Sequence, residues 1–190
     1  SGLNLSKAQD VVLVSNFIYM GPTDSRVIQG VHLGQENSVS FKYDIENGLH
    51  FKRVFSQDGQ DPFDSVEYER RSSIIREPDG TVVFEMKDIE IPKDWSQVAT
   101  DIVAQKYFRK TGVPQYYKDG TSKLNSDGKP MLGPETSVKQ IIHRLAGTWR
   151  YWAEKYGYFA STQDAEIFYD ELVAMLLKQM AAPNSPQWFN

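Results

Sequence analysis

The sequence predicts an α+β protein, in which a β-rich N-terminal part is followed by a helical domain of at least three helices. Up to about residue 93, short runs of β-branched and aromatic residues alternate with turn signals, a pattern typical of strands. From residue 94 onward, apolar residues recur three and four positions apart, as they do in amphipathic helices. The change of period therefore marks the change of fold.

Residues 1–50 are predicted to form a β-rich extension that matches no known unit. Asn47-Gly48 is a hairpin signal within it. Residues 51–93 are predicted to form a β-hairpin or arm, because Pro78 fixes φ and Gly80 accepts a positive φ in a turn between extended segments. The strands expected in these two parts are 11–14, 17–20, 27–33, 39–43, 81–86 and a brief continuation at 89–91.

Residues 94–190 are predicted to form the helical domain. The first helix is expected to begin at Asp94 as its N-cap and to end at Gly112, with Pro114 beyond it. A mobile surface loop rich in glycine and proline is expected at 115–134. The apolar stripe expected to face the core of the first helix consists of Trp95, Val98, Ala99, Ile102, Val103 and Tyr107.

Two further helices are predicted to pair in an antiparallel arrangement. Ser137 and Gln140 have the spacing of a capping box at the start of one helix. The other begins at Ser161 and is expected to continue until Pro183. The short connection at 157–160 favours neighbouring antiparallel helices.

The composition excludes several classes of protein. The net charge of −4 and the pI of about 5.4 argue against a general nucleic-acid binder. No apolar run approaches the roughly 18 residues of a membrane span, and the start lacks the pattern of a signal peptide. The sequence has no cysteine, which excludes disulfides, thiolate metal sites and cysteine nucleophiles. We therefore expect a cytoplasmic protein without nucleic-acid or membrane partners.

No self-contained catalytic or metal-binding motif is present, and the remaining polar and aromatic patterns each have two interpretations. The three histidines are interpreted as surface or structural residues rather than metal ligands. The acidic run is interpreted as a solvated face, with a paired acid/base site as the alternative. The aromatic run is interpreted as core, with stacking on a base or ligand as the alternative. These residues are His32, His50 and His143; Asp61, Asp64, Glu67 and Glu69; and Trp149, Tyr151, Trp152, Tyr156, Tyr158 and Phe159.

The last eight residues, 183–190, form a polar segment that we call the tail. Pro183 is expected to end the preceding helix, and Pro186 favours an extended conformation at Ser185. The tail would then hold the side chains of Asn184 and Ser185 at the entrance to the structure that follows it. The alternative is a turn that leads into a strand.

Several blocks together resemble the N-terminal region of coenzyme B12-dependent (class II) ribonucleotide reductases. Their order and spacing carry the resemblance over roughly residues 51–190. The blocks are FDSVEYERR at 63–71, PDGTVVFE at 78–85, DWSQVATDI at 94–102, AQKYFRK at 104–110 and AAPNSPQWFN at 181–190.

The resemblance implies an enzyme that reduces ribonucleotides to 2′-deoxyribonucleotides with adenosylcobalamin as its cofactor. In that family, homolysis of the cobalt–carbon bond yields a radical that is relayed to a cysteine, and a cysteine pair supplies the reducing equivalents. The catalytic domain is an α/β barrel that follows a helical N-terminal region. Residues 94–190 would be that region, ending at the start of the barrel. The resemblance leaves open a diphosphate or triphosphate substrate and a homodimer of the full enzyme.

By position in the motif, Ser185 is expected to contact the substrate phosphates, with Asn184 and Gln187 as further candidates. A hydroxyl binds phosphate well without adding charge. Because the sequence has no cysteine, the chain lacks the radical carrier and the reductant, and no catalytic residue or metal ligand is expected in it.

We therefore expect a fragment, a split subunit or a shortened polypeptide that binds the rest of the reductase and supports its barrel. Most cobalamin contacts would lie in that remainder. Two other functions stay open on sequence grounds: a non-enzymatic module that binds a protein or ligand through residues 1–50, and an enzyme of another class, for which carboxylate chemistry alone would remain.

Overall fold

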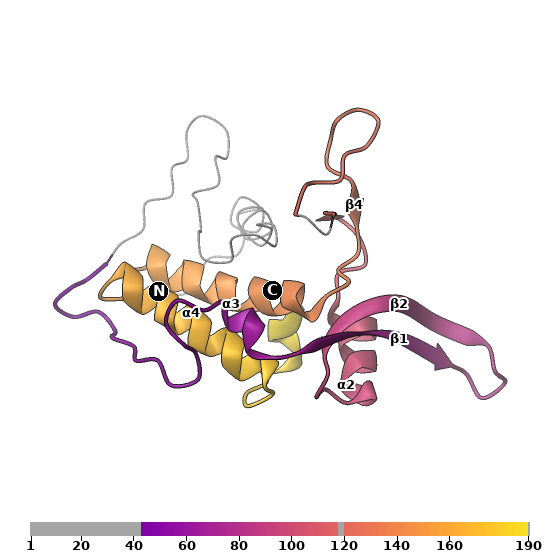
Figure 1. The fold of residues 1–190 in the computed structure, drawn as a ribbon, viewed down its shortest axis with the longest axis horizontal. Coiled ribbons are helices and arrows are strands. Elements are labelled where there is room, and N and C mark those ends of the chain that lie inside the picture. Colours follow the sequence, from indigo (N-terminus) through magenta and orange to yellow (C-terminus); the bar gives the residue numbers. More distant parts are fainter. Residues whose placement is uncertain (1–42, 118–119, 190) are drawn as a thin grey trace.

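The computed structural model describes residues 43–117 and 120–189. Its fold is α+β, as the sequence predicts. In Figure 1, helices α3 (Val138–Lys155) and α4 (Thr162–Leu177) lie side by side, and the strand pair β1–β2 extends away from them. The strands expected between residues 11 and 43 fall outside the described residues, apart from Tyr43, which belongs to no strand.

The turn at Asn47-Gly48 forms, but it does not close a hairpin between the described residues. The residue after it, Leu49, instead pairs with Phe159 in a parallel bridge at the connection between α3 and α4. Only glycine fits at position 48, because a Cβ there would lie 2.4 Å from the backbone nitrogen of Ala160. The hairpin prediction at this point is therefore wrong, since the turn docks the segment onto the helices.

Strands β1 (Tyr68–Arg76) and β2 (Val82–Pro92) form the antiparallel hairpin that the turn at 76–80 predicts. β2 is one strand with a register shift, rather than the two short pieces expected from sequence. Its far end is apolar and buried at Ile89 and Ile91, whereas Val83 near the tip is 52% exposed. The base of the hairpin therefore belongs to the core, and its tip projects from it (Figure 1).

Helix α2 (Gln97–Ile102) differs from the predicted first helix at both ends. Its N-cap is Ser96, whose hydroxyl accepts a hydrogen bond from the Ala99 amide, and not Asp94. A π-helical turn, η3 (Val103–Tyr107), follows directly, and the backbone becomes extended at Phe108, well before Gly112. Thr100 and Ala104 are buried in this segment, whereas Val98 and Ile102 are 66% and 43% exposed. The assignment of Val98 and Ile102 to the core stripe is therefore wrong.

The segment between η3 and α3 leaves the core as a long, exposed excursion. Strands β3 (Val113–Pro114) and β4 (Leu132–Gly133) close its base, and single bridges join Tyr116 to Ser122 and Leu124 to Pro130. The predicted surface loop is thus partly paired among its described residues.

Both predicted caps of the helix pair are confirmed. Ser137 and Gln140 form a capping box at the start of α3, and the Ser161 hydroxyl caps α4. The end of α4 lies at Leu177 rather than at Pro183. There, Gln179 adopts a positive φ of 53°, and the Met180 amide donates to the Met175 carbonyl over 2.9 Å. This is a Schellman closure with glutamine at the position that usually holds glycine.

The helices, α2 with η3, and the base of the hairpin share one hydrophobic core. Its members include Phe63, Ile89, Ile91, Trp95, Val103, Phe108, Val138, Ile141, Ile142, Leu145, Tyr169, Leu172, Val173, Leu176, Leu177 and Trp188. In the part of the chain that the structure describes, no helix is both long and apolar enough to cross a bilayer. Because Trp188 belongs to this core, the tail is anchored to the body of the protein.

Candidate functional site

The described part of the tail, residues 183–189, forms a 3₁₀ helix, η4 (Ser185–Phe189), rather than the extended segment expected at Ser185. The Gln187 amide donates to the Asn184 carbonyl over 2.9 Å, which closes the first turn. The side chains of Asn184, Ser185 and Gln187 are exposed, whereas Trp188 is buried. The tail therefore presents the three predicted substrate-binding residues on one short turn.

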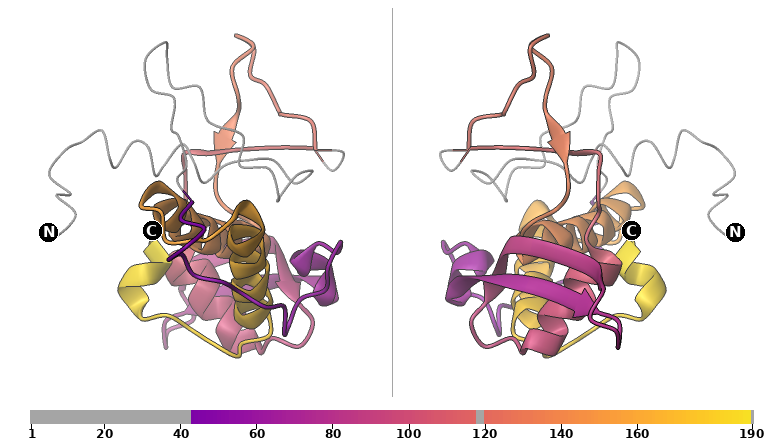
Figure 2. Two further views of the ribbon diagram at one scale, coloured as in Figure 1. Left: turned by 90° about the vertical axis from the view of Figure 1, so that its left-hand side faces the viewer. Right: turned by 90° about the vertical axis from the view of Figure 1, so that its right-hand side faces the viewer.

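The ring of Trp188 fastens this turn to the core. It stacks on Tyr107 of η3, with ring centroids 5.8 Å apart and planes 27° apart. Its indole nitrogen donates to the Pro183 carbonyl over 3.0 Å. The Tyr107 hydroxyl also donates to the Ser185 hydroxyl over 3.1 Å. Figure 2 shows the tail, in yellow, lying on the outside of the helices beside the α2–η3 segment.

A buried ion pair lies beneath the tail. Arg144 of α3 is fully buried, and its guanidinium contacts the Glu135 carboxylate over 3.0 and 3.1 Å. The same guanidinium donates to the main-chain carbonyl of Trp188 over 2.9 Å and to that of Tyr107 over 3.2 Å. Charge-assisted bonds of this kind are the stronger class of protein hydrogen bonds. One arginine thus joins α3, η3 and the tail.

Positive charge gathers next to this ion pair. Arg109, two residues beyond Tyr107, is half-buried, and among the described residues no acceptor lies within hydrogen-bonding distance of its guanidinium. Burial and the like charge of Arg144 lower the pKa of Arg109, while Glu135 opposes that shift. Burial likewise lowers the pKa of Lys110. Two cationic residues thus follow soon after Tyr107, on whose ring the tail rests.

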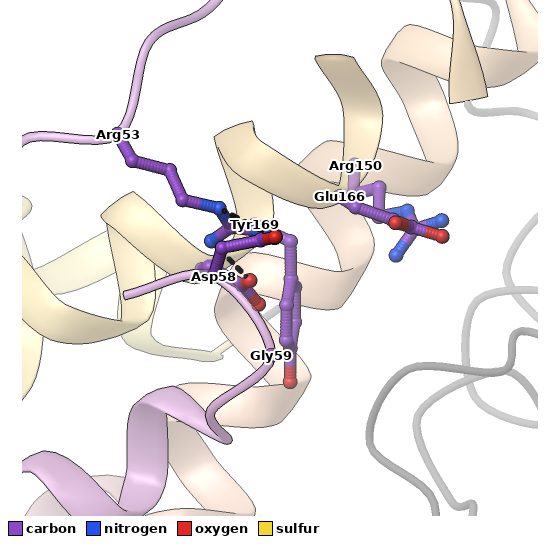
Figure 3. A pocket seen from close by; sticks show the side chains of 7 residues that line it. Arg53, Asp58, Gly59, Arg150, Glu166 and Tyr169 are labelled. Atoms are coloured by element: carbon purple, nitrogen blue, oxygen red, sulfur yellow. Dashed lines mark hydrogen bonds and ion pairs between the residues drawn. The ribbon is translucent and has the colours of Figure 1, made fainter. Parts of the chain in front are cut away.

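A small polar cavity of about 160 Å³ lies on the other side of α4 (Figure 3). Arg53 closes one wall, 2.6 Å from Asp170 and 3.4 Å from Asp58. Arg150 and Glu166 line it from α3 and α4, and the Arg150 charge is matched by Glu154 over 3.2 Å. Because three carboxylates and two arginines line the cavity, it offers no excess positive charge to an anionic ligand.

His143 belongs to α3, and its Nδ1 lies 2.5 Å from the hydroxyl of Tyr169 in α4. Burial lowers its pKa from 6.5 to about 4; the Asp61 carboxylate opposes this shift and Arg150 adds to it. Among the described residues no group of three metal-ligating side chains occurs, and His50, which is exposed, lies 3.5 Å from Asp164. His143 is thus packed against Tyr169 and His50 lies at the surface, whereas His32 lies outside the described residues.

The depressed pKa of His143 predicts a loss of stability in acid. The unfolded chain binds a proton near pH 6.5, but the folded chain does so only near pH 4. The free energy of unfolding is therefore expected to fall by about 2–3 kcal/mol between pH 7 and pH 4, and to lose little more from this group below pH 4. Urea denaturation across that range, with H143Q as the control that cannot titrate, measures the difference. An equal slope for both proteins would contradict the prediction.

The acidic run is a solvated face, as its preferred interpretation predicts. Asp61 caps a 3₁₀ turn, η2 (Pro62–Ser65), by accepting from the Phe63 amide. Asp64, Glu67 and Glu69 are exposed. Glu67 pairs with Lys93 over 2.5 Å, which lowers the pKa of Glu67. No acid/base pair is formed by these carboxylates.

The aromatic run belongs only in part to the core, which was its preferred interpretation. Tyr151 and Phe159 are buried, whereas Tyr156 and Tyr158 are 46% and 57% exposed. An apolar hollow of about 290 Å³ lies beside them. Its lining consists of Leu49, Phe51, Trp149, Trp152, Ala153, Tyr158, Phe159 and Phe168.

Sequence reasoning found the tail but missed the residues that hold it. Tyr107 was expected only as part of an apolar stripe, and Arg144 and Glu135 were not expected to have a role. One signal was available for Arg144, because a charged residue stands between Ile142 and Leu145 on the apolar face of α3. A charge at such a position requires a buried partner.

Comparisons with known proteins give a consistent result. The family model described as class II vitamin B12-dependent ribonucleotide reductase matches residues 69–179. Three similar proteins are each named vitamin B12-dependent ribonucleotide reductase. They are 43% identical over 158 residues in Bradyrhizobium diazoefficiens, 45% over 158 residues in Agrobacterium fabrum and 41% over 145 residues in Streptomyces clavuligerus. In each case 75% of this chain is covered, but only 12–13% of the relative, so the chain spans about an eighth of the length of these relatives.

Proposed function

The chain belongs to the class II vitamin B12-dependent ribonucleotide reductase family, and we propose that it forms the N-terminal portion of such an enzyme. In this proposal it supports a catalytic barrel and contributes its tail to the ribonucleotide site. Residues 94–190 form the helical domain that leads into the barrel, residues 51–93 form an arm beside it, and residues 1–50 are an extension. The full enzyme acts in the cytoplasm.

The observation that carries the proposal is the exposure of the Ser185 side chain on an anchored turn. Its side chain is exposed on a turn whose neighbour Trp188 is buried in the core, so the hydroxyl is both accessible and held in place. The half-buried guanidinium of Arg109, for which the described residues supply no hydrogen-bond acceptor, supports a negatively charged ligand near Tyr107. Hydroxyl groups and cations together suit the phosphates of a nucleotide. Asn184 and Gln187, exposed on the same turn, are the further candidates for contact.

The cofactor of the full enzyme is adenosylcobalamin, which supplies the radical when it is bound. The described residues show no site for it, because one of the two described histidines is exposed and the other is enclosed against Tyr169. We therefore assign cobalamin mainly to the rest of the enzyme. With no cysteine in its sequence, the chain itself binds and orients substrate rather than carrying the radical or the reducing equivalents.

A chimeric reductase tests this proposal. The segment of the Agrobacterium fabrum relative that matches this chain is replaced by the chain, and ribonucleotide reduction is measured with adenosylcobalamin. At 45% identity we expect the chimera to fold and to reduce ribonucleotides, with the parental relative as the control. A chimera that folds and binds cobalamin but reduces no nucleotide would refute the proposed role.

Within that chimera, S185A is expected to raise the KM for the ribonucleotide about tenfold or more, because a hydrogen bond to a charged group is worth about 1.5–3 kcal/mol. S185T, which keeps the hydroxyl, is the matched control and should stay within about threefold of the unmodified chimera, the tolerance expected for contacts of this kind. Steady-state kinetics provides the measurement. Equal KM values for S185A and S185T would contradict a contact through the hydroxyl.

A further inference from the structure

The described part of the tail, residues 183–189, contacts the rest of the protein mainly through Trp188, and its strongest contact is a charge-assisted hydrogen bond from Arg144. The Trp188 carbonyl accepts from Arg144, and the Trp188 ring rests on Tyr107, whose own carbonyl accepts from the same guanidinium. Glu135 binds the remaining face of Arg144 and also accepts from the Arg109 amide over 2.9 Å. We call Tyr107, Glu135 and Arg144 the tail clamp.

We propose that Arg144 is a positioning residue, which fixes the tail through the Trp188 carbonyl and thereby sets where Ser185 meets the substrate. This inference rests on the proposed substrate contact of Ser185. Arg144 itself is fully buried, so in this proposal it acts through the tail rather than by touching the substrate. Its planar guanidinium reaches Glu135, Tyr107 and Trp188 at once, which the single nitrogen of a lysine does not do.

Tyr107 adds an orienting contact to this arrangement. Because its hydroxyl donates to the Ser185 oxygen, one lone pair of that oxygen is occupied by a protein donor. A serine hydroxyl has one proton to donate and two lone pairs to accept with. The Ser185 proton is therefore left to point away from Tyr107, toward the open side of the turn. A phosphate oxygen, which accepts hydrogen bonds, is the complementary ligand for that proton.

The chain contains a matched control for Arg144. Arg150 stands on the same helix, is also buried, and also pairs with a buried carboxylate, Glu154, over 3.2 Å. It makes no contact with the described part of the tail, residues 183–189. A lysine at position 150 therefore perturbs a buried ion pair of α3 to a similar degree without touching the tail.

Hydrogen exchange of the 190-residue chain, measured by mass spectrometry, tests the clamp directly. In R144K, exchange in peptides covering residues 181–189 is expected to speed up about tenfold, because loss of one charge-assisted hydrogen bond lowers the free energy of local opening. Peptides covering α4 serve as the internal reference, and R150K should leave the tail unchanged. Equal tail exchange in R144K and R150K would overturn the clamp.

Kinetics of the chimera separates the clamp from the substrate contact. R144K is expected to raise the KM for the ribonucleotide about fivefold or more while kcat changes by less than about twofold, since the loss falls on binding. Faster tail exchange with an unchanged KM would support the contact between Arg144 and the tail but refute the role of the tail in substrate binding. Unchanged exchange would overturn the clamp, whatever the KM.

Y107F tests the orienting contact of Tyr107 with Ser185 independently of R144K. It removes only the hydroxyl that contacts Ser185 and leaves the ring stacked on Trp188. We expect tail exchange to stay unchanged and the KM to rise about threefold, the effect of one neutral hydrogen bond. An unchanged KM in Y107F would remove the orienting contact from the clamp.

Discussion

Replacing Arg144 with alanine is expected to lower the free energy of unfolding by about 3–5 kcal/mol, because it leaves the buried carboxylate of Glu135 without its cationic partner. The main-chain carbonyls of Tyr107 and Trp188 lose their donor in the same substitution. Loss of an ion pair from the surface would cost no more than about 1 kcal/mol. Urea denaturation at pH 7 distinguishes these magnitudes.

The double variant R144M/E135L is the control for this prediction. It removes both charges and fills the space with apolar side chains, so most of the stability should return. The tail bonds to Arg144 would still be absent. A single variant as stable as the unmodified chain would show that Glu135 is not buried in solution, and would contradict the structure at this point.

The second large effect is expected at Trp95, between the hairpin and α2. This side chain is 5% exposed, and its indole nitrogen donates to the Leu177 carbonyl at the end of α4 over 2.7 Å. W95A is expected to cost about 3–5 kcal/mol, since it opens a cavity and leaves that carbonyl without its donor. Thermal or urea unfolding provides the measurement.

W95F separates the two contributions at this position. It keeps most of the apolar volume and loses the hydrogen bond, so a loss of about 1–2 kcal/mol is expected. A W95F variant that is as unstable as W95A would mean that the hydrogen bond, and not the packing, dominates. If W95A lost less than W95F, the assignment of Trp95 to the core would be wrong.

The features predicted correctly from the sequence are those that depend on neighbouring residues. The capping box at Ser137 and Gln140, the cap at Ser161 and the turn at Pro78–Gly80 each involve residues within four positions of one another. Their geometry is set by local hydrogen bonds and by φ preferences. The period of the apolar residues likewise predicts α3 and α4.

The wrong boundaries arise where local signals compete or are absent. Asp94 and Ser96 are both good N-caps, and the choice between them depends on Trp95, whose burial keeps the residues before Ser96 in a turn. The end of α4 is closed by Gln179 in a left-handed conformation, for which glutamine gives no sequence signal. The π-helical turn η3 likewise has no recognisable signal in the sequence.

The candidate site could be predicted only in part. Ser185, Asn184 and Gln187 are predictions from the motif, whereas the anchoring of the tail depends on Tyr107, Arg144 and Trp188, which are far apart in sequence. No periodicity encodes that meeting of three segments. The charged residue on the apolar face of α3 was the available hint, and it indicates a buried partner without identifying it.

A crystal structure of the chimera with a bound ribonucleotide tests the proposed role of the tail most directly. We predict that the Ser185 hydroxyl lies about 2.5–3.0 Å from a phosphate oxygen, the usual range for a hydrogen bond between oxygens. Trp188 should still rest on Tyr107 in that complex. A nucleotide bound in the chimera with its phosphates held entirely by other segments, and with no contact to residues 184–187, would contradict the account.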